Sequence, residues 1–274
     1  MSLFKSICRR GLGALVFGGL AAASLGVAPV QAATPEEIKA KGKITVGVMT
    51  DFPPFGGTDA QQQPAGYDAD VAKLLAKALG VQLELVPVTG PNRIPYLLTN
   101  KIDALIATFG ITAERSKQVL FSNPYSSITI YLLAPKSAAV KAPEDLKSLS
   151  GISVARASTQ DTALTAVAPA GTPLKRYDDD ATALQALISG QVQAIGASNV
   201  VLAQLNKDYP QLNLEPKLTL REQANGIAFR KADTALAEYV NKFIADIEKS
   251  GDLSKINQAW FGIPLTKLPP MPQF

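Results

Sequence analysis

The sequence predicts an α/β fold with largely parallel strands and two similar lobes. Segments with alternating apolar residues interleave with amphipathic helical segments from residue 43 to residue 134, which is typical of α/β proteins. The same succession restarts near residue 142 and continues to residue 262. After an export segment is set aside, about 240 residues remain, enough to bury a core for one or two domains.

The elements of the first half follow from their apolar periodicity. Residues 43–49 alternate apolar side chains and predict a strand, and the Pro- and Gly-rich stretch 50–66 predicts a loop. Residues 67–80 carry one apolar stripe, begin with acidic residues and end at Gly80, so they predict a helix. The remaining predictions are a strand at 81–88, a short helix at 92–100, and strands at 102–107 and 126–134.

The second half repeats this alternation. Residues 234–251 carry the clearest amphipathic pattern, and a glycine ends the segment. The other predicted helices are 142–149, 157–167, 179–190, 200–209 and 252–262. The predicted strands are 152–156, 194–197, 212–216 and 225–233, and a Pro-rich tail covers 268–274.

Residues 1–32 are expected to be a secretory signal peptide rather than part of the fold. Three basic residues precede an apolar, Gly- and Ala-rich run at 12–27, and Val30-Gln31-Ala32 supplies a small-residue cleavage site. The alternative is an uncleaved membrane anchor, because the run is nearly long enough to span a bilayer. Cys8 lies before the run, where a lipidated cysteine is not expected. We expect cleavage near Ala32 and a soluble periplasmic protein.

The composition of the mature chain excludes several kinds of function. Removing Lys5, Arg9 and Arg10 from 27 basic residues leaves 24 against 23 acidic residues, so nucleic acid is not an expected partner. The chain has no histidine, and its single cysteine lies in the signal peptide. Catalysis by Ser-His-Asp or Cys-His groups and a zinc site of His and Cys are therefore excluded, and no cofactor or metal is expected.

Two hydroxyl-rich turns lie where helices are predicted to begin. They are residues 108–112, followed by Arg115, and Ser158-Thr159. Helix N-termini carry unpaired N–H groups and partial positive charge, which suit an anion, and a cleft between α/β lobes is a common ligand site. The alternative is that each hydroxyl only caps its helix.

Ordered motifs then make the chain resemble a known family. These motifs are "GVMTDFPPF", "PAGYDADVAKLLAKALG", "NRIPYLLTNKIDALIATFGITAER", "VLFSNPY", "LSGISVARASTQDTAL", "ALISGQVQAIGAS" and "NGIAFRKAD". Together they resemble the amino-acid-type extracytoplasmic solute-binding proteins (family 3) of polar amino-acid ABC transporters, over about residues 42–262.

The resemblance implies a type II periplasmic-binding-protein fold with two mixed, mostly parallel sheets joined by two crossing strands. The crossings are expected near residues 133–136 and 225–227. Lobe 1 would comprise 33–134 and 226–274, and lobe 2 would comprise 135–225. Such a protein closes on a small carboxylate-bearing ligand, usually an amino acid, and docks on ABC permease subunits as a monomer.

The resemblance also assigns the residues that hold the ligand carboxylate. Arg115 corresponds to the arginine that pairs with it, and a planar guanidinium can give two parallel charged hydrogen bonds. Thr108 and Gly110 correspond to positions that also meet this carboxylate, and Gly110 could serve only through its N–H. Ser158 and Thr159 correspond to the pair that contacts it from the second lobe. For Arg115, the alternative is a surface ion pair.

Three further residues are expected at the ligand. Phe52 corresponds to the aromatic residue that covers it, and the alternative is a loop residue that plugs the core. Arg93 corresponds to a subset that binds acidic amino acids through a second carboxylate, and the alternative is a solvated helix residue. Asp51 could reach the cleft and would then favour a cationic group. We expect Asp68 and Asp70 to be a helix cap and a surface charge.

One position departs from the family pattern. Many members carry an aspartate after the strand "AIGA" to pair with the ligand ammonium, whereas this chain has Ser198 and Asn199. An ammonium without a carboxylate partner loses a charge-assisted hydrogen bond. Either another acid stands in, Asp51 or Asp161, or the ligand is not an ordinary α-amino acid.

The sequence therefore favours a binding protein for transport, with two alternatives. The first is an enzyme on the same scaffold, such as a cyclohexadienyl dehydratase, for which Asp51, Asp161 and residues 178–180 are the possible proton donors. The second is a sensor that reports the ligand to a membrane receptor. A binder of a non-amino carboxylate is a variant of the leading hypothesis.

Overall fold

The computed structural model describes residues 32–265 and 267–274, so the predicted signal peptide lies outside the described residues except for Ala32. The described chain is an α/β fold, which confirms the predicted fold class. Its main sheet has the strand order β4-β1-β5-β10-β6-β9-β7-β8, and β2 and β3 form a separate small hairpin. Among the described residues, no helix is both long and apolar enough to cross a membrane.

The sheet is mixed. The strands are β1 (Lys43–Met49), β2 (Gly57–Thr58), β3 (Pro64–Ala65), β4 (Gln82–Val88), β5 (Ala104–Leu105), β6 (Leu120–Pro135), β7 (Ile152–Ala155), β8 (Leu174–Tyr177), β9 (Ala194–Ser198) and β10 (Leu214–Phe229). Strand β1 is parallel to β4 and β5, and β7 is parallel to β8 and β9. The antiparallel pairs are β5–β10, β10–β6 and β6–β9.

The helices cover these strands in chain order. They are α1 (Pro35–Lys41), α2 (Tyr67–Leu79), α3 (Arg93–Leu98), α4 (Ala113–Gln118), α5 (Thr159–Val167), α6 (Asp180–Ile188), α7 (Asn199–Asp208), α8 (Thr234–Lys249) and α9 (Asp252–Phe261). Two 3-10 helices, η1 (Pro143–Ser148) and η2 (Pro210–Leu212), complete the set. The helix predicted at 142–149 is therefore a 3-10 helix.

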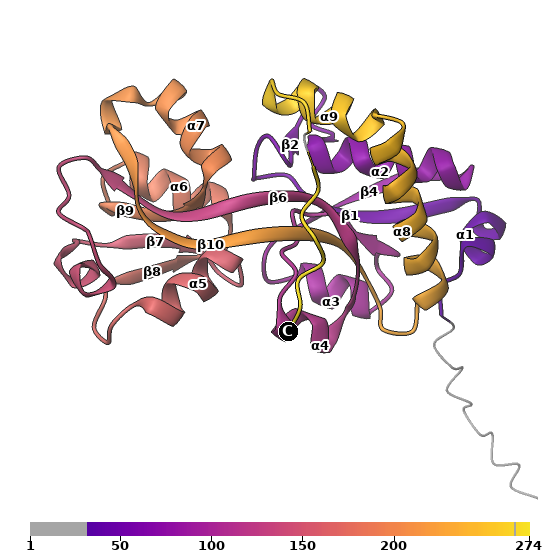
Figure 1. The fold of residues 1–274 in the computed structure, drawn as a ribbon, viewed down its shortest axis with the longest axis horizontal. Helices are drawn as coiled ribbons and strands as arrows, with labels where there is room; N and C mark the ends of the chain where they lie inside the picture. Colours follow the sequence, from indigo (N-terminus) through magenta and orange to yellow (C-terminus); the bar gives the residue numbers. More distant parts are fainter. Residues whose placement is uncertain (1–31, 266) are drawn as a thin grey trace, which may run out of the picture. The chain divides into compact units, whose positions relative to one another are not determined.

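Strands β6 and β10 are longer than predicted, and they run side by side through the sheet (Figure 1). The separate strands predicted at 212–216 and 225–233 form one strand, β10, which ends at Phe229. The intervening residues 217–222 are polar and did not read as a strand, but they pair with β6 through a register broken by bulges. The two expected sheets are consequently continuous with each other.

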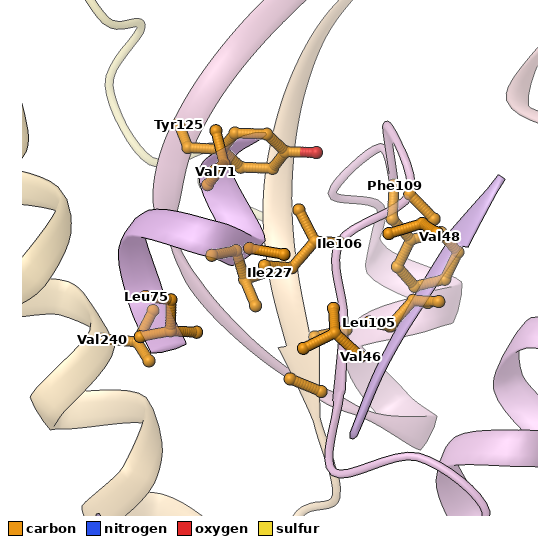
Figure 2. Packing of buried hydrophobic residues seen from close by; sticks show 14 of the residues in the cluster. Val46, Val48, Val71, Leu75, Leu105, Ile106, Phe109, Tyr125, Ile227 and Val240 are labelled. Carbon is orange, nitrogen blue, oxygen red and sulfur yellow. The ribbon is translucent and has the colours of Figure 1, made fainter. Parts of the chain in front are cut away.

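Strands β6 and β10 also link separate hydrophobic cores. The largest core includes Ile130 of β6 and Ile227 of β10, and Figure 2 shows Ile227 beside side chains of α2 and β5. Leu132 and Leu133, further along β6, belong to two other cores, which pack against β7 and α6 respectively. The cores thus change between Ile130 and Leu132, and the exact lobe boundaries remain a prediction.

Candidate functional site

Arg115 is held by acceptors from two separate parts of the chain. It lies in the first turn of α4, which Thr112 caps by accepting a hydrogen bond from the Arg115 N–H. Its Nη1 donates to the Gly110 carbonyl oxygen at 2.9 Å and to Thr159 Oγ1 at 3.1 Å. Its Nη2 donates to the Ala157 carbonyl oxygen at 3.0 Å. The predicted turns at 108–112 and 158–159 therefore meet at this guanidinium.

Arg93 reaches the same carbonyl oxygen. It is the first residue of α3, and its Nη2 donates to the Ala157 oxygen at 3.1 Å. The guanidinium carbon atoms of Arg93 and Arg115 lie 4.6 Å and 4.2 Å from the centre of the Phe109 ring, so both arginines stack on this aromatic side chain. Neither arginine forms an ion pair with any acid of the described residues.

Burial makes these two charges unfavourable. Arg93 is 4% exposed and Arg115 is 8% exposed. Burial lowers the pKa of Arg93 to about 10, although the nearby Asp180 and Asp51 oppose this shift. Burial also lowers the pKa of Arg115 well below its usual value, and the positive charges of Arg93 and Arg221 add to the effect. A buried pair of guanidiniums that share a neutral acceptor is suited to an anionic ligand.

Two non-glycine residues with left-handed backbone shape this region. Ala157, whose carbonyl oxygen accepts from both arginines, has φ of 60°, and Thr108 has φ of 45°. Such conformations are unfavourable for residues with a Cβ and persist where surrounding contacts hold them. Both residues lie in the turns that meet at Arg115.

Thr108 is fixed by a buried carboxylate. Its hydroxyl donates to Asp68 Oδ2 at 2.8 Å, and its N–H donates to the Tyr125 hydroxyl at 3.2 Å. The Tyr125 hydroxyl in turn donates to Asp68 Oδ1 at 2.7 Å. Asp68 is fully buried, and burial raises its pKa to about 6 against the effect of these hydrogen bonds.

The expectation for Asp68 as a helix cap or surface charge is wrong, because its side chain points from the first turn of α2 into the core. Asp70 does lie toward the surface, where it accepts from Trp260 Nε1 at 2.7 Å and pairs with Lys73 at 2.8 Å. An Asp-x-Asp pair at a helix start has one residue on each side of the helix. The sequence did not show which of the two was buried.

The other predicted carboxylate contacts lie beside Arg115 but already have local partners. Ser158 caps α5 by accepting from the Asp161 N–H at 3.0 Å. Thr159 Oγ1 accepts from Arg115, as described above. Gly110 contributes its carbonyl oxygen to Arg115, rather than the N–H that its match to the family suggested.

Phe52 and the acids beside it form a second group. Phe52 is buried, stacks on Phe55 with ring centres 6.2 Å apart, and lines the cavity next to Arg93. Asp51 Oδ2 accepts from the Asp180 N–H, the first residue of α6, at 2.9 Å. Asp51 Oδ1 is buried and has no hydrogen-bond partner in the described residues.

Asp51 and Asp180 therefore approach each other from different parts of the chain. Burial raises the pKa of Asp180 to about 7, and the charge of Asp51 adds to this shift. Burial likewise raises the pKa of Asp51. Two carboxyl groups that share a poorly solvated place favour a cation between them. Asp180 was not predicted as a ligand contact; its place in the acidic start of a helix read as a cap.

The position that departs from the family pattern has a structural role. Ser198 is fully buried at the end of β9, and its hydroxyl caps α7 by accepting from the Val201 N–H at 3.3 Å. Asp161 pairs with Arg176 at 2.8 Å and accepts from Thr165. Of the two acids proposed as substitutes, Asp51 has a free buried oxygen and Asp161 is engaged elsewhere.

Gln223 is a cavity residue that the sequence reasoning missed. A cavity of about 20 Å³ is lined by Phe52, Arg93, Ser158, Thr159, Asp180 and Gln223, among others. Gln223 and Asn225 lie two residues apart in an otherwise apolar stretch of β10, and alternate residues of a strand share a face. Two polar residues at this spacing in a buried strand were the available signal.

A larger cavity adjoins the first one. It has a volume of about 510 Å³ and shares Phe52 and Asp180 with the smaller cavity. Asp51 and the apolar residues Leu184 and Ile188 also line it. The site thus has a basic side at the two arginines and an acidic, partly apolar side beyond Phe52.

Comparisons with known proteins agree with this arrangement. Residues 44–263 match the family model of bacterial extracellular solute-binding proteins, family 3. The chain is 30% identical over 233 residues to the L-cystine-binding protein TcyJ of Escherichia coli (strain K12), covering 84% of this chain and 87% of that protein. It is 34% identical over 230 residues to the ABC transporter glutamine-binding protein GlnH of Bacillus subtilis (strain 168), covering 81% and 82%.

A solved structure shows the same likeness. An ancestral amino acid-binding protein, a precursor of cyclohexadienyl dehydratase, superposes with a TM-score of 0.76 at 32% identity, covering 84% of this chain and 100% of that chain. The family model spans most of the chain, and the relatives are binding proteins. The chain therefore belongs to the bacterial extracellular solute-binding proteins, family 3.

Proposed function

We propose that this protein is the extracytoplasmic binding component of an ABC importer and captures a polar amino acid by its carboxylate. The observation that carries the proposal is the pair of buried guanidiniums, Arg93 and Arg115, which converge on the carbonyl oxygen of Ala157 without a carboxylate partner. A ligand carboxylate in place of that oxygen would supply the missing negative charge. Two charged hydrogen bonds from one arginine would also fix its orientation.

Binding in this way requires the turns to separate. The cavity of about 20 Å³ has room for about one water molecule, which is far less than an amino acid needs. The bonds from Arg115 to Thr159 and Ala157, and from Asp180 to Asp51, join segments that pack in different cores. We infer that these contacts open to admit the ligand and are replaced by contacts to the ligand on closure.

The remaining predicted residues divide between the two sides of the site. Thr108, Gly110, Ser158 and Thr159 would complete the carboxylate site around Arg115. On the other side, Phe52 would cover the ligand.

The acidic side bears on the class of side chain. Asp51 and Asp180 would receive a cationic group that extends toward the larger cavity. Their negative charges face Arg93, which weakens the case for a second ligand carboxylate there. Ser198 would act by holding the start of α7.

The proposal includes partners and location. We propose export with cleavage near Ala32, a monomer in the periplasm, and docking of the closed form on ABC permease subunits rather than on a nucleic acid or a sensory receptor. The relatives named above are binding proteins, which supports this assignment. Permease and ATPase genes beside this one would favour transport over sensing.

Calorimetry on the mature chain tests the central proposal. The protein is unfolded, freed of ligand and refolded, then titrated with arginine, histidine, glutamine, cystine, glutamate, aspartate, glutarate and 2-oxoglutarate. At least one amino acid should bind tightly, and Arg115→Ala should weaken it by about 100-fold or more, because a charged hydrogen-bond pair is lost. Lys117→Ala, an exposed residue of the same helix, is the control. Absence of binding across the panel, or full affinity in Arg115→Ala, would contradict the proposal.

The enzyme alternative has a separate test. We propose that the protein does not turn over its ligand, but Asp180 has a pKa near 7, which would suit a general acid. Prephenate is incubated with the wild type and with Asp180→Asn, and the aromatic product is followed by absorbance. We expect no product with either protein. Product formation that disappears in Asp180→Asn would favour a dehydratase.

A further inference from the structure

Gln223 carries a buried acceptor that faces the site. The side chain is 4% exposed and lines the small cavity together with Arg93 and Thr159. Its oxygen, Oε1, is one of the buried side-chain atoms of the described residues that have no hydrogen-bond partner. An unpartnered buried carbonyl oxygen is unfavourable unless a donor reaches it at some stage of function.

The orientation of this amide is fixed by its other end. Gln223 Nε2 donates to the carbonyl oxygen of Thr108 at 3.3 Å and to Asn225 Oδ1. Both partners are acceptors here, because Asn225 donates its own Nδ2 to Ser126 Oγ at 3.0 Å. Exchanging the oxygen and nitrogen of Gln223 would place two acceptors against each other. The network therefore directs Oε1 away from these two partners.

The backbone beside Arg115 makes room for this side chain. A Cβ on Gly110 would lie 2.5 Å from Cδ and 2.7 Å from Oε1 of Gln223, so no larger residue fits without displacing the amide. The carbonyl oxygen of the same glycine accepts from Arg115. Gln223 Oε1 is thus packed against the residue that positions the proposed carboxylate grip.

The other residues considered for an ammonium partner are less suited to it. Ser198 uses its hydroxyl to cap α7, and Asp161 is paired with Arg176. Asp51 lines the larger cavity, on the acidic side beyond Phe52. In an α-amino acid the ammonium is attached to the carbon that carries the carboxylate, so its acceptor must lie beside Arg115.

We propose that Gln223 Oε1 accepts a hydrogen bond from the α-ammonium of the ligand, in the role that the family pattern gives to an aspartate at position 198. The ligand is then an α-amino acid whose carboxylate binds Arg115 and whose ammonium meets a neutral amide oxygen held by Thr108 and Asn225. This inference rests on the proposed function, because it assumes the carboxylate grip at Arg115.

The test compares each amino acid with the same molecule lacking its amine. Arginine is paired with 5-guanidinopentanoate, glutamine with glutaramate, and glutamate with glutarate, and all are titrated calorimetrically into the refolded mature chain. The variant is Gln223→Met, which keeps the length of the side chain but removes the acceptor. Gln193→Met, which removes an amide that accepts from the Ser150 N–H away from the site, is the control.

The expected result is a change in discrimination. Gln223→Met should weaken the amino acid by about 10- to 100-fold, since a hydrogen bond to a charged group is lost, and should change its amine-free partner by less than about threefold. The ratio is measured within one variant, so destabilisation of the fold cancels from it. If Gln223→Met does not fold, Gln223→Glu decides, because it keeps an oxygen acceptor and should preserve or increase the preference for the amine.

Other outcomes separate this inference from the proposed function. Equal weakening of both ligands in Gln223→Met would give Gln223 a structural role only and overturn the inference. A wild type that binds amine-free acids as tightly as amino acids would also overturn it, while leaving the carboxylate grip intact. A wild type that binds none of the panel would overturn the proposed function, and the inference with it.

Discussion

At the scale of single residues, the site depends on buried polar groups whose partners lie far away in the sequence. Asp68 shows this most clearly, because its carboxylate lies in the core without a cationic partner and holds the left-handed Thr108 through one hydrogen bond. Thr108 in turn accepts from Gln223 through its carbonyl oxygen. We infer that Asp68 is a positioning residue for the turn that leads to Arg115.

Asp68 should make stability depend on pH. Its pKa is raised to about 6 in the folded protein from an ordinary value near 3.8, so the folded state binds its proton more tightly than the unfolded state does. The contribution of this group therefore favours folding below about pH 4 and is lost as pH rises through 6, by about 3 kcal/mol. Asp68→Asn should remove this part of the profile.

Urea unfolding between pH 4 and pH 7 measures the effect. The wild type and Asp68→Asn are compared at each pH, and Asp70→Asn, on the surface of the same helix, is the control. A profile of Asp68→Asn that matches the wild type would show that the carboxylate titrates at its ordinary value.

Gly110 should not tolerate a side chain. In Gly110→Ala, the added methyl group would overlap the Gln223 amide, so we expect a loss of about 1–3 kcal/mol in unfolding free energy and weaker ligand binding. Gly57→Ala is the matched control, because the nearest atom to its Cβ is a carbonyl oxygen 3.9 Å away. Urea unfolding and calorimetry on the two variants check this, and wild-type behaviour of Gly110→Ala would contradict the packing described.

At the scale of elements, helix starts carry the site because their caps come from the sequence itself. Thr112 caps α4 and Ser158 caps α5, and these two short segments bring Arg115 and Thr159 together. The same chemistry explains Ser198, whose hydroxyl caps α7. A residue that departs from the family's ligand contact thus still has a local role.

Ser198→Ala should affect stability and leave ligand discrimination unchanged. The loss of an N-cap costs about 1 kcal/mol, and the buried hydroxyl has no other assigned partner in the described residues. Urea unfolding should show this loss, while calorimetry should give the wild-type preference between an amino acid and its amine-free partner. A large fall in amino-acid affinity alone would instead place Ser198 at the ligand.

At the scale of the whole described chain, β6 and β10 are the continuous link between the cores that meet at the site. Each is 16 residues long, and their pairing is interrupted by bulges in the region where the cores change. Bulges weaken a ladder locally and increase its twist. We infer that the proposed opening and closing take place by bending of these two strands.

Distance measurements test this motion. The sequence has cysteine only at position 8, so Lys101→Cys and Lys175→Cys in the mature chain allow two specific labels. Adding a tightly bound amino acid should shift the label-to-label distance distribution to a single shorter distance, and Arg115→Ala should abolish the shift at the same ligand concentration. An unchanged distribution at saturation would contradict lobe closure.

The sequence by itself determined the class of fold and most of its elements. Periodicities of 3.6 and 2 residues are local properties, and they placed α2, α8, β1 and β4 close to their observed bounds. The ordered motifs also identified the family, which the comparisons confirm. Arg115 and the hydroxyl turns were predicted as site residues because capping chemistry is written within a few residues of the chain.

Only the tertiary structure decided which polar side chains are buried and what they face. Asp68 and Asp70 look alike in sequence, yet one lies in the core and the other contacts Trp260 at the surface. Gln223 and Asp180 reach the site through contacts with residues more than a hundred positions away. Burial and long-range pairing are properties of packing, and a local pattern cannot report them.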